Sequence, residues 1–278
     1  MAQPVSLAHK SLPHSHYPLL AGLSTRMAQI NTYVNGKLVP YETIRLWEAK
    51  RLAHVTNFVY RQLGMQQPLG AQTMDEKKRS LAELKIEVGE DNVRKMLGFS
   101  LGLSQLVMKI ASFLSFGRRK YSVVEVAISG VDLEPSAFLD KLNHIMLNDG
   151  VEYSKMRLMA CPDHYLIVKT GGATQEVIET TGGSPFPTQF YICYGDSTGL
   201  RSQMDPTYDV QLFGVARTKS GTLIGGVRHQ IRKESDGLRL KLLVEFPALI
   251  LDWMVRQHQA HLMCEFNNWI RDVLNMRS

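Results

Sequence analysis

The sequence predicts an α+β protein in which a curved antiparallel sheet grips a long C-terminal helix. Three observations predict this class. Residues from about Leu249 to Asn275 have the apolar spacing of one amphipathic helix. A series of short β-branched runs, separated by turn residues, comes before that helix. Long helical patterns fill much of residues 1–120, so we expect a helical N-terminal region at 1–120 and an α+β domain at 121–278.

Three helices are predicted in the N-terminal region, at Pro40–Leu63, Asp75–Val88 and about Asp91–Phe116. The third is apolar over about the ~20 residues that a bilayer-spanning helix needs. Gln105 and Lys109 argue against a span, because a central lysine costs about 2.5–3.5 kcal/mol on insertion scales. We therefore expect a buried helix or one that lies at an interface.

The α+β domain is predicted to begin with a strand at Tyr121–Ser129 and a short helix from Asp132 to about Leu147. Glycines and turn residues separate the strand-like runs that follow. These runs are Met156–Cys161, Tyr165–Thr170, Thr174–Thr180, Gln189–Tyr194, Asp209–Thr218, Thr222–Lys233 and Leu238–Phe246. Their sequential order favours antiparallel pairing, and the last run leads directly to the C-terminal helix.

Composition is that of an ordinary globular protein: 44% of the 278 residues are hydrophobic, which is enough for a substantial core. The three cysteines, Cys161, Cys193 and Cys264, form no CxxC pair. This pattern suggests neither a disulfide framework nor a thiolate zinc site. No signal-peptide pattern is visible at the N-terminus, so we expect reduced cysteines and a cytoplasmic setting.

Charge is unevenly distributed along the chain. Residues 1–120 hold 17 Lys and Arg against 8 Asp and Glu, whereas residues 121–278 hold 15 against 18. A basic half could bind nucleic acid or an anionic membrane. The alternative is that these scattered charges lie on solvated helix faces.

Two common enzyme classes lack their motifs. The glycine pairs of this chain do not have the spacing of a dinucleotide-binding or phosphate-binding loop. The G-x-S-x-G nucleophile elbow of many serine hydrolases is also absent from the sequence. The sequence therefore offers no motif for a nucleotide site or a serine nucleophile.

Polar residues follow one stripe of the C-terminal helix. His261 and Glu265 are four residues apart and share a face with His258, so the HxxxE pair can supply two ligands to one metal ion. In a largely apolar cavity such groups are costly to bury unless they are paired or bind metal. The alternative interpretation leaves His258 and Glu265 at the helix edge, beside an apolar core face.

Two further polar residues interrupt apolar runs. His144 lies in the short helix within AFLDKLNHIML, and Glu179 ends the run Val177-Ile178-Glu179. Together with His261 and Glu265 they would make a set of two histidines and two glutamates. Such a set suits zinc or another borderline divalent ion.

The order of these motifs resembles the diacetylphloroglucinol hydrolase and phloretin hydrolase family. The resemblance covers about Val123–Leu274 and is carried by His144, V-I-E with Glu179 ahead of GGSPFP, V-R-H-Q with His229, and H-L-M-C-E-F-N-N at 261–268. It implies a Bet v 1-like helix-grip fold and hydrolysis of a carbon–carbon bond between an acyl group and a phenolic ring. It also implies a Zn²⁺ ion held by His144, Glu179, His261 and Glu265, with His229 as a catalytic residue near the substrate carbonyl.

The leading hypothesis is thus a zinc-dependent hydrolase that acts on a small aryl or polyketide-like ketone. Zinc would polarise the ketone, and a second histidine could stabilise the oxyanion or move the proton that the ring carbon takes up. A non-catalytic helix-grip protein that binds a hydrophobic ligand is the alternative. A nucleic-acid or anionic-membrane module in the basic N-terminal half is the third possibility.

Overall fold

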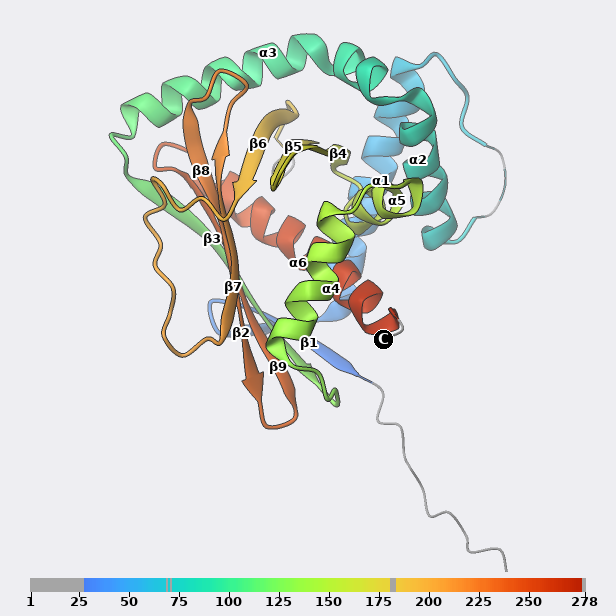
Figure 1. Ribbon diagram of the computed structural model, residues 1–278. Helices are drawn as coiled ribbons and strands as arrows, with labels where there is room; N and C mark the ends of the chain where they lie inside the picture. Colours follow the sequence, from blue (N-terminus) through green and yellow to red (C-terminus); the bar gives the residue numbers. More distant parts are fainter. Residues whose placement is uncertain (1–27, 69, 71, 181–183, 277–278) are drawn as a thin grey trace, which may run out of the picture.

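The computed structural model describes residues 28–68, 70, 72–180 and 184–276. Over these residues the chain forms six helices and one open nine-stranded sheet (Figure 1). Every pairing between neighbouring strands is antiparallel. The predicted α+β class with an antiparallel sheet and a C-terminal helix is therefore confirmed.

The sheet has the strand order β2-β1-β3-β9-β8-β7-β6-β5-β4. Its strands are β1 (Gln29–Val34), β2 (Lys37–Val39), β3 (Arg119–Ser129), β4 (His164–Gly171), β5 (Thr174–Glu179), β6 (Thr188–Tyr194), β7 (Val210–Arg217), β8 (Leu223–Glu234) and β9 (Gly237–Pro247). The β-branched and alternating runs of the sequence predict β3 and β4 to β9 to within a few residues. The strands β1 and β2 lie before residue 120 and join the same sheet, because β1 pairs with β3 and the edge strand β2 pairs with β1.

The helices are α1 (Tyr41–Gln62), α2 (Met74–Val88), α3 (Glu90–Leu114), α4 (Pro135–Leu147), α5 (Val151–Ala160) and α6 (Asp252–Asn275). The predicted strand at Met156–Cys161 is wrong, since this stretch belongs to helix α5. Its methionines, arginine, leucine and alanine are good helix formers. Their helical preference therefore outweighs a short apolar run that also fits a strand.

The main core lies between the central strands and α6. Alternate residues of β3 and β9 point to this core and pair across the two strands, as Val124 does with Leu242 and Val126 with Leu240. Helix α4 adds the fully buried Phe138. Helix α6 has buried residues along most of its length, so it is enclosed by the sheet and the other helices.

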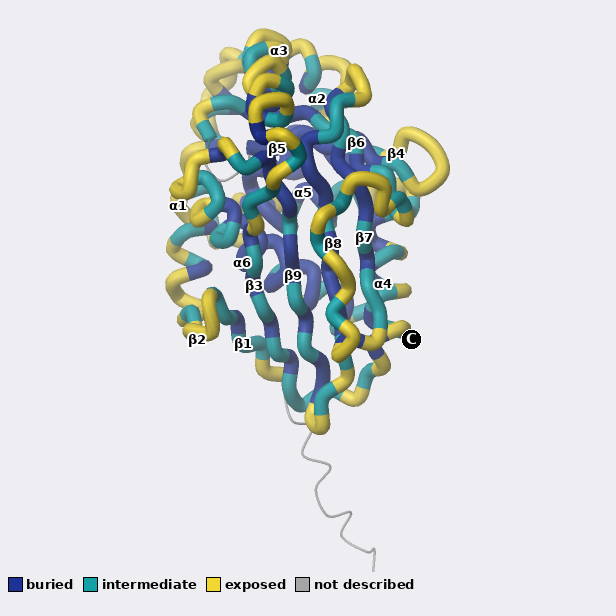
Figure 2. Tube along the Cα trace, turned by 90° about the vertical axis from the view of Figure 1, so that its left-hand side faces the viewer, coloured by how far each residue is buried: buried dark blue, intermediate teal, exposed yellow. Residues whose placement is uncertain are grey.

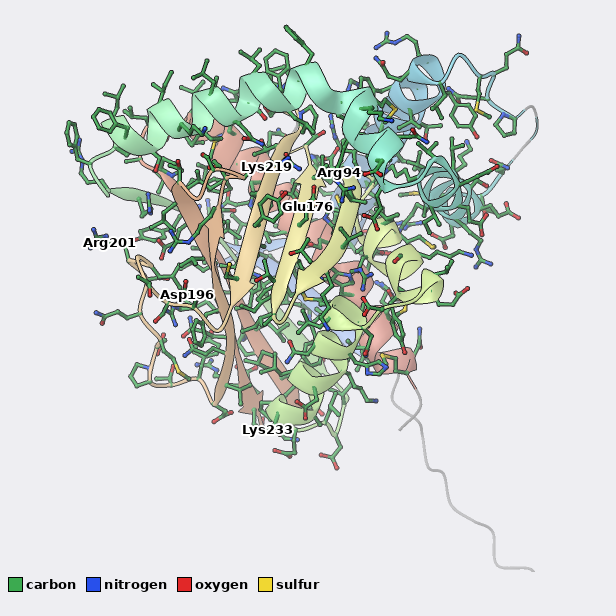
Figure 3. The ribbon with its side chains drawn as sticks, turned by 45° about the horizontal axis from the view of Figure 1, so that its top comes forward. Arg94, Glu176, Asp196, Arg201, Lys219 and Lys233 are labelled. Carbon is green, nitrogen blue, oxygen red and sulfur yellow. The ribbon has the colours of Figure 1, made fainter. Side chains whose placement is uncertain are left out.

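Helix α3 runs along the top of the molecule and is tied to the sheet by polar contacts (Figure 1). Arg94 forms an ion pair with Glu176 of β5, with 2.8 Å between Nη2 and Oε2 (Figure 3). Further along, the Gln105 amide donates to Gln189 of β6 and the Ser112 hydroxyl donates to the Leu223 carbonyl. Among the described helices α3 alone is long and apolar enough to span a membrane. Only 22% of its most apolar window is buried inside the molecule, so most of this apolar segment is exposed.

A buried ion pair joins the N-terminal helices to α6. The Lys78 ammonium of α2 lies 2.6 Å from Glu48 of α1, and both side chains are almost fully buried. Asn268 of α6 donates to the same carboxylate at 2.9 Å. Arg45 of α1 itself lies 3.0 Å from the second carboxylate oxygen, so partners from three helices replace water around this buried charge.

We predict that Lys78→Met lowers the free energy of unfolding by about 1–3 kcal/mol, because it leaves the buried Glu48 carboxylate with the partly exposed Arg45, 3.0 Å away, as its remaining cation. Urea denaturation measures this loss. Glu48→Gln combined with Lys78→Met should recover most of it. The control is Lys155→Met, which breaks a pair of equal length to the half-exposed Glu83 and should cost less than about 1 kcal/mol. Equal losses in the two single variants would contradict the prediction.

Candidate metal centre and its cavity

A cavity lies between the sheet and α6, with about 870 Å³ of empty space that includes part of the opening to solvent. Its walls are apolar towards α3, where Met108 faces Ile224 and Phe246 of the sheet. Its polar lining includes Glu179, His261 and Glu265, together with His229 and His258. This polar group comes from β5, β8 and α6, three elements far apart in the sequence.

Two imidazoles and two carboxylates meet at this cavity. The Nε2 atoms of His164 and His261 lie 3.1 Å apart. The Glu265 Oε1 atom is 3.3 Å from His164 Nε2, and the Glu179 Oε2 atom is 3.7 Å from the Nε2 atom of each histidine. Four potential ligand atoms thus converge on one point from β4, β5 and α6.

These separations suit one tetrahedral metal ion. Ligand bonds of about 2.0–2.2 Å, as zinc makes to nitrogen and oxygen, place tetrahedral ligand atoms roughly 3.3–3.6 Å from one another. Four of the six separations between these atoms run from 3.1 to 3.7 Å. The cluster therefore already has nearly the dimensions of a coordination shell.

Hydrogen bonding fixes which nitrogen of His164 is free to act as a ligand. Its Nδ1 lies 2.8 Å from the Arg157 carbonyl oxygen, which can only accept, so Nδ1 carries a proton. In the neutral ring Nε2 then carries a lone pair, and this lone pair faces the oxygens of Glu179 and Glu265. The repulsion between these lone pairs is relieved by a proton shared with His261 Nε2, 3.1 Å away, or by a metal ion at the same point.

Cys161, His164 and His261 form a buried group that could hold a metal ion. The Cys161 thiol, however, lies 3.6 Å from Nδ1 of His261, on the other side of the ring from Nε2. The two nitrogens of an imidazole point in different directions, so one ion cannot use Nε2 of His261 and this thiol together. Burial raises the pKa of Cys161 well above its usual value, which also disfavours the thiolate.

The N-terminal helices position the loop that carries His164. Arg51 of α1 donates to the buried Asp163 carboxylate through Nε at 2.9 Å and Nη2 at 2.6 Å. Lys85 of α2 donates to the carbonyl oxygens of Pro162 at 2.9 Å and His164 at 2.6 Å. Burial lowers the pKa of Lys85 to about 7, against the opposing effect of Asp163. Helices α1 and α2 therefore hold His164 in place.

The two facing histidines differ in their protonation preference. Burial by itself lowers the pKa of His164, but its hydrogen bond to Glu265 and the nearby carboxylates raise it above the usual value. Burial and the charge of His164 lower the pKa of His261 well below its usual value. Without a metal ion, one proton therefore resides preferentially on His164. A metal ion at the same point would replace that proton.

The structure brings together three of the four predicted ligands, Glu179, His261 and Glu265. It does not bring His144 to them. His144 lies on the exposed side of α4, where its Nε2 is 2.6 Å from the Tyr153 hydroxyl and its Nδ1 is 2.6 Å from the Asn148 amide. The inward face of α4 carries residues such as Phe138 and Leu142 instead, which belong to the main core.

His164 takes the place that the sequence analysis assigns to His144. The register of the β4–β5 hairpin would not have identified it. This hairpin turns at Gly171–Gly172, and a regular count back from the pair Gly171–Thr174 sets Leu166 opposite Glu179. Two register shifts, between Lys169 and Gly171 and between His164 and Leu166, bring His164 opposite Glu179 instead.

Other cavity residues have unused hydrogen-bonding capacity. His229 Nδ1 and Trp269 Nε1 are both buried, and neither has a hydrogen-bond partner among the described residues. His229 packs edge-on against Phe266 at 4.9 Å between ring centroids. His258 is stacked on His261 at 5.4 Å and bonds through Nδ1 to the Ser122 hydroxyl at 3.1 Å. The predicted catalytic residue thus lines the same cavity as the four-atom cluster.

No protein-family model and no curated protein sequence matches this chain. The interpretation of the site therefore depends on its geometry and on the residues that carry the family resemblance. Within those motifs, Gly182 and Gly183 lie outside the described residues, as do the first 27 residues of the predicted N-terminal region.

Stability should fall in acid partly through His229. Burial lowers its pKa to about 3, whereas an unfolded histidine has a pKa of about 6.5. Between these values the unfolded chain binds the proton and the folded chain does not. The free energy of unfolding is therefore unaffected by protonation of His229 above pH ~6.5. It falls as the pH decreases towards about 3, by up to about 1.4 kcal/mol per pH unit.

We predict that His229→Leu makes chelator-treated protein less sensitive to acid than the wild type. Between pH ~6.5 and ~5 the variant should lose up to about 2 kcal/mol less unfolding free energy, which urea denaturation at the two pH values measures. The exposed His144 supplies the control, since His144→Leu should leave the pH dependence unchanged. Parallel pH profiles for wild type and His229→Leu would refute the assignment.

Proposed function

We propose that this protein is a zinc-dependent hydrolase with a Bet v 1-like helix-grip fold, which cleaves a carbon–carbon bond in a small aryl or polyketide-like ketone. The convergence of His164, His261, Glu179 and Glu265 beside an apolar cavity carries the proposal. The family resemblance supports the reaction class, with His164 in place of His144 among the ligands.

The donor set supports zinc over calcium or magnesium. Two imidazole nitrogens and two carboxylate oxygens suit a borderline ion, whereas calcium and magnesium prefer oxygen ligands. When bound, zinc would polarise a carbonyl oxygen and lower the pKa of water in the site. The backing hydrogen bond from His164 Nδ1 to the Arg157 carbonyl orients this ligand, as is usual for metal-bound histidine.

The reaction requires one water molecule and no redox partner. The oxygen of water adds to the ketone carbon, and the bond between that carbon and the ring then breaks. Its electron pair remains on the ring carbon, which takes up a proton, so the products are a carboxylic acid and the shortened phenol. His229 lies in the cavity wall with an Nδ1 that has no partner among the residues the structure describes, and we assign this proton transfer to it.

The cavity favours a planar ligand with few polar groups. Phe190, Ile192 and Phe246 supply apolar lining, while the Trp269 N–H is a buried donor that finds no partner within the described part of the chain. Tyr194 adds a hydroxyl that donates to Gln175 at 3.1 Å. An aryl ketone with ring hydroxyls could place its ring against the apolar lining and an oxygen near the Trp269 N–H.

Metal analysis tests the proposal. Purified protein should contain about one zinc ion per chain. His164→Ala and His261→Ala should each lower zinc affinity by more than about 100-fold, because losing only a hydrogen-bond partner of a ligand already costs roughly 10–100-fold. The same variants should lose hydrolysis of a monoacylphloroglucinol, measured by release of the carboxylic acid.

Two control variants make the test specific. His144→Ala should keep full zinc content, since His144 lies outside the cluster. Cys161→Ser should also keep the ion, whereas loss of zinc in this variant would assign the metal to the Cys161-His164-His261 group instead. A folded chain without metal that binds an apolar fluorescent probe equally well with and without chelator would favour the alternative, a non-catalytic ligand-binding protein.

A further inference from the structure

One face of α3 is apolar, exposed and without a partner among the described residues (Figure 2). We call it the α3 strip. Its large side chains are Phe99 (86% exposed), Leu106, Val107, Ile110, Phe113 (75% exposed), Leu114 and Phe116. The loop between β9 and α6 extends the strip with Leu249 and Leu251, and the first turn of α6 adds Trp253. This loop is joined to the end of α3 by a hydrogen bond from Leu249 N to the Ser115 hydroxyl. Exposed apolar surface of this extent marks an interaction site.

Cations accompany the strip. The segment 95–120 contains five Lys and Arg residues and no Asp or Glu. Two of the five are neutralised: Arg119 is buried 3.5 Å from Glu245, and Lys120 lies 2.5 Å from Asp252 at the start of α6. Arg118 is exposed just beyond the helix, and Arg201 reaches the same end, where its Nε donates to the Gly117 carbonyl (Figure 3). The other three cations of the segment and Arg201 give the strip a surplus of positive charge.

The strip also lies on an outer edge of the molecule. Helix α3 spans the top of the fold, with the sheet and the other helices below it (Figure 1). Its opposite face lines the cavity through Met108 and packs on Ala216 and Ile224 of the sheet. An apolar outer face and the apolar end of the cavity are thus separated by the thickness of one helix.

We propose that α3 docks this protein onto an anionic lipid bilayer, with the helix lying flat in the interface. Phenylalanine, tryptophan and aliphatic side chains would enter the acyl boundary, and Lys109, Arg118 and their neighbours would meet lipid headgroups. Docking there places the apolar end of the cavity next to the bilayer, which is the reservoir of a hydrophobic ligand. The inference is independent of the metal centre.

The same observations disfavour other occupants. A bilayer-spanning orientation would break the contacts of Arg94, Gln105 and Ser112 with the sheet. Nucleic acid would match the cations but would not accommodate a strip of leucine, isoleucine and phenylalanine. A two-fold contact with a second copy through α3 would bring the positive segment 95–120 against itself.

Vesicle sedimentation tests the docking, with full-length protein and chelator present. Vesicles of phosphatidylcholine with about one third phosphatidylglycerol should bind the protein at least about tenfold more tightly than phosphatidylcholine alone. Phe113→Ser combined with Phe116→Ser should weaken binding at least about tenfold, and Arg118→Gln about fivefold at low salt. The matched control is Leu46→Ser with Val151→Ser, which removes two exposed apolar side chains from α1 and α5 and should bind like the wild type.

Three results would overturn the proposal. One is the absence of binding to either vesicle. Another is a dimer in analytical ultracentrifugation that the Phe113/Phe116 variant converts to a monomer, which would assign the strip to a second copy. The third is salt-dependent retention on DNA that Arg118→Gln weakens and the Phe113/Phe116 variant does not, which would assign the surface to nucleic acid.

Discussion

Two carboxylates and two imidazoles are buried together at one point of the cavity, where a proton on His164 or a metal ion would offset the charge of the carboxylates. Glu179 and Glu265 both face His164 Nε2, while the Nδ1 proton of that ring is committed to the Arg157 carbonyl. A buried charge without a counter-charge costs several kcal/mol. The elements that carry these groups, β4, β5 and α6, therefore meet at a site that needs a proton or a metal ion among its four atoms. The proposed chemistry takes place at this site.

The N-terminal helices take part in this site although they contribute none of the four converging atoms. Arg51 and Lys85 bind the loop before β4 and so fix the position of His164. Helix α3 closes the apolar end of the cavity with Met108. This division of roles accounts for a region that the family resemblance, confined to the C-terminal part, leaves unexplained. It also places the basic charges of the N-terminal half next to the cavity.

Most elements of the fold could be predicted because the pattern of apolar and β-branched residues within each segment indicates a helix or a strand. Apolar spacing predicts α1, α2, α3 and α6, and β-branched alternation predicts β3 to β9. The failures are elements whose local signal is weak or divided. Helix α5 contains a run that also fits a strand, and the short strands β1 and β2 depend on pairing, β1 with β3 and β2 with β1.

Periodicity within single segments predicts the class of the fold and the long final helix. It also predicts that His261 and Glu265 share one face of that helix. Which second histidine joins them depends on tertiary packing. His144 and His164 both interrupt apolar surroundings, but the helical turn of α4 points one to solvent and the β4–β5 register sets the other opposite Glu179. Ligand choice at a site built from distant segments is a property of packing, which no single segment encodes.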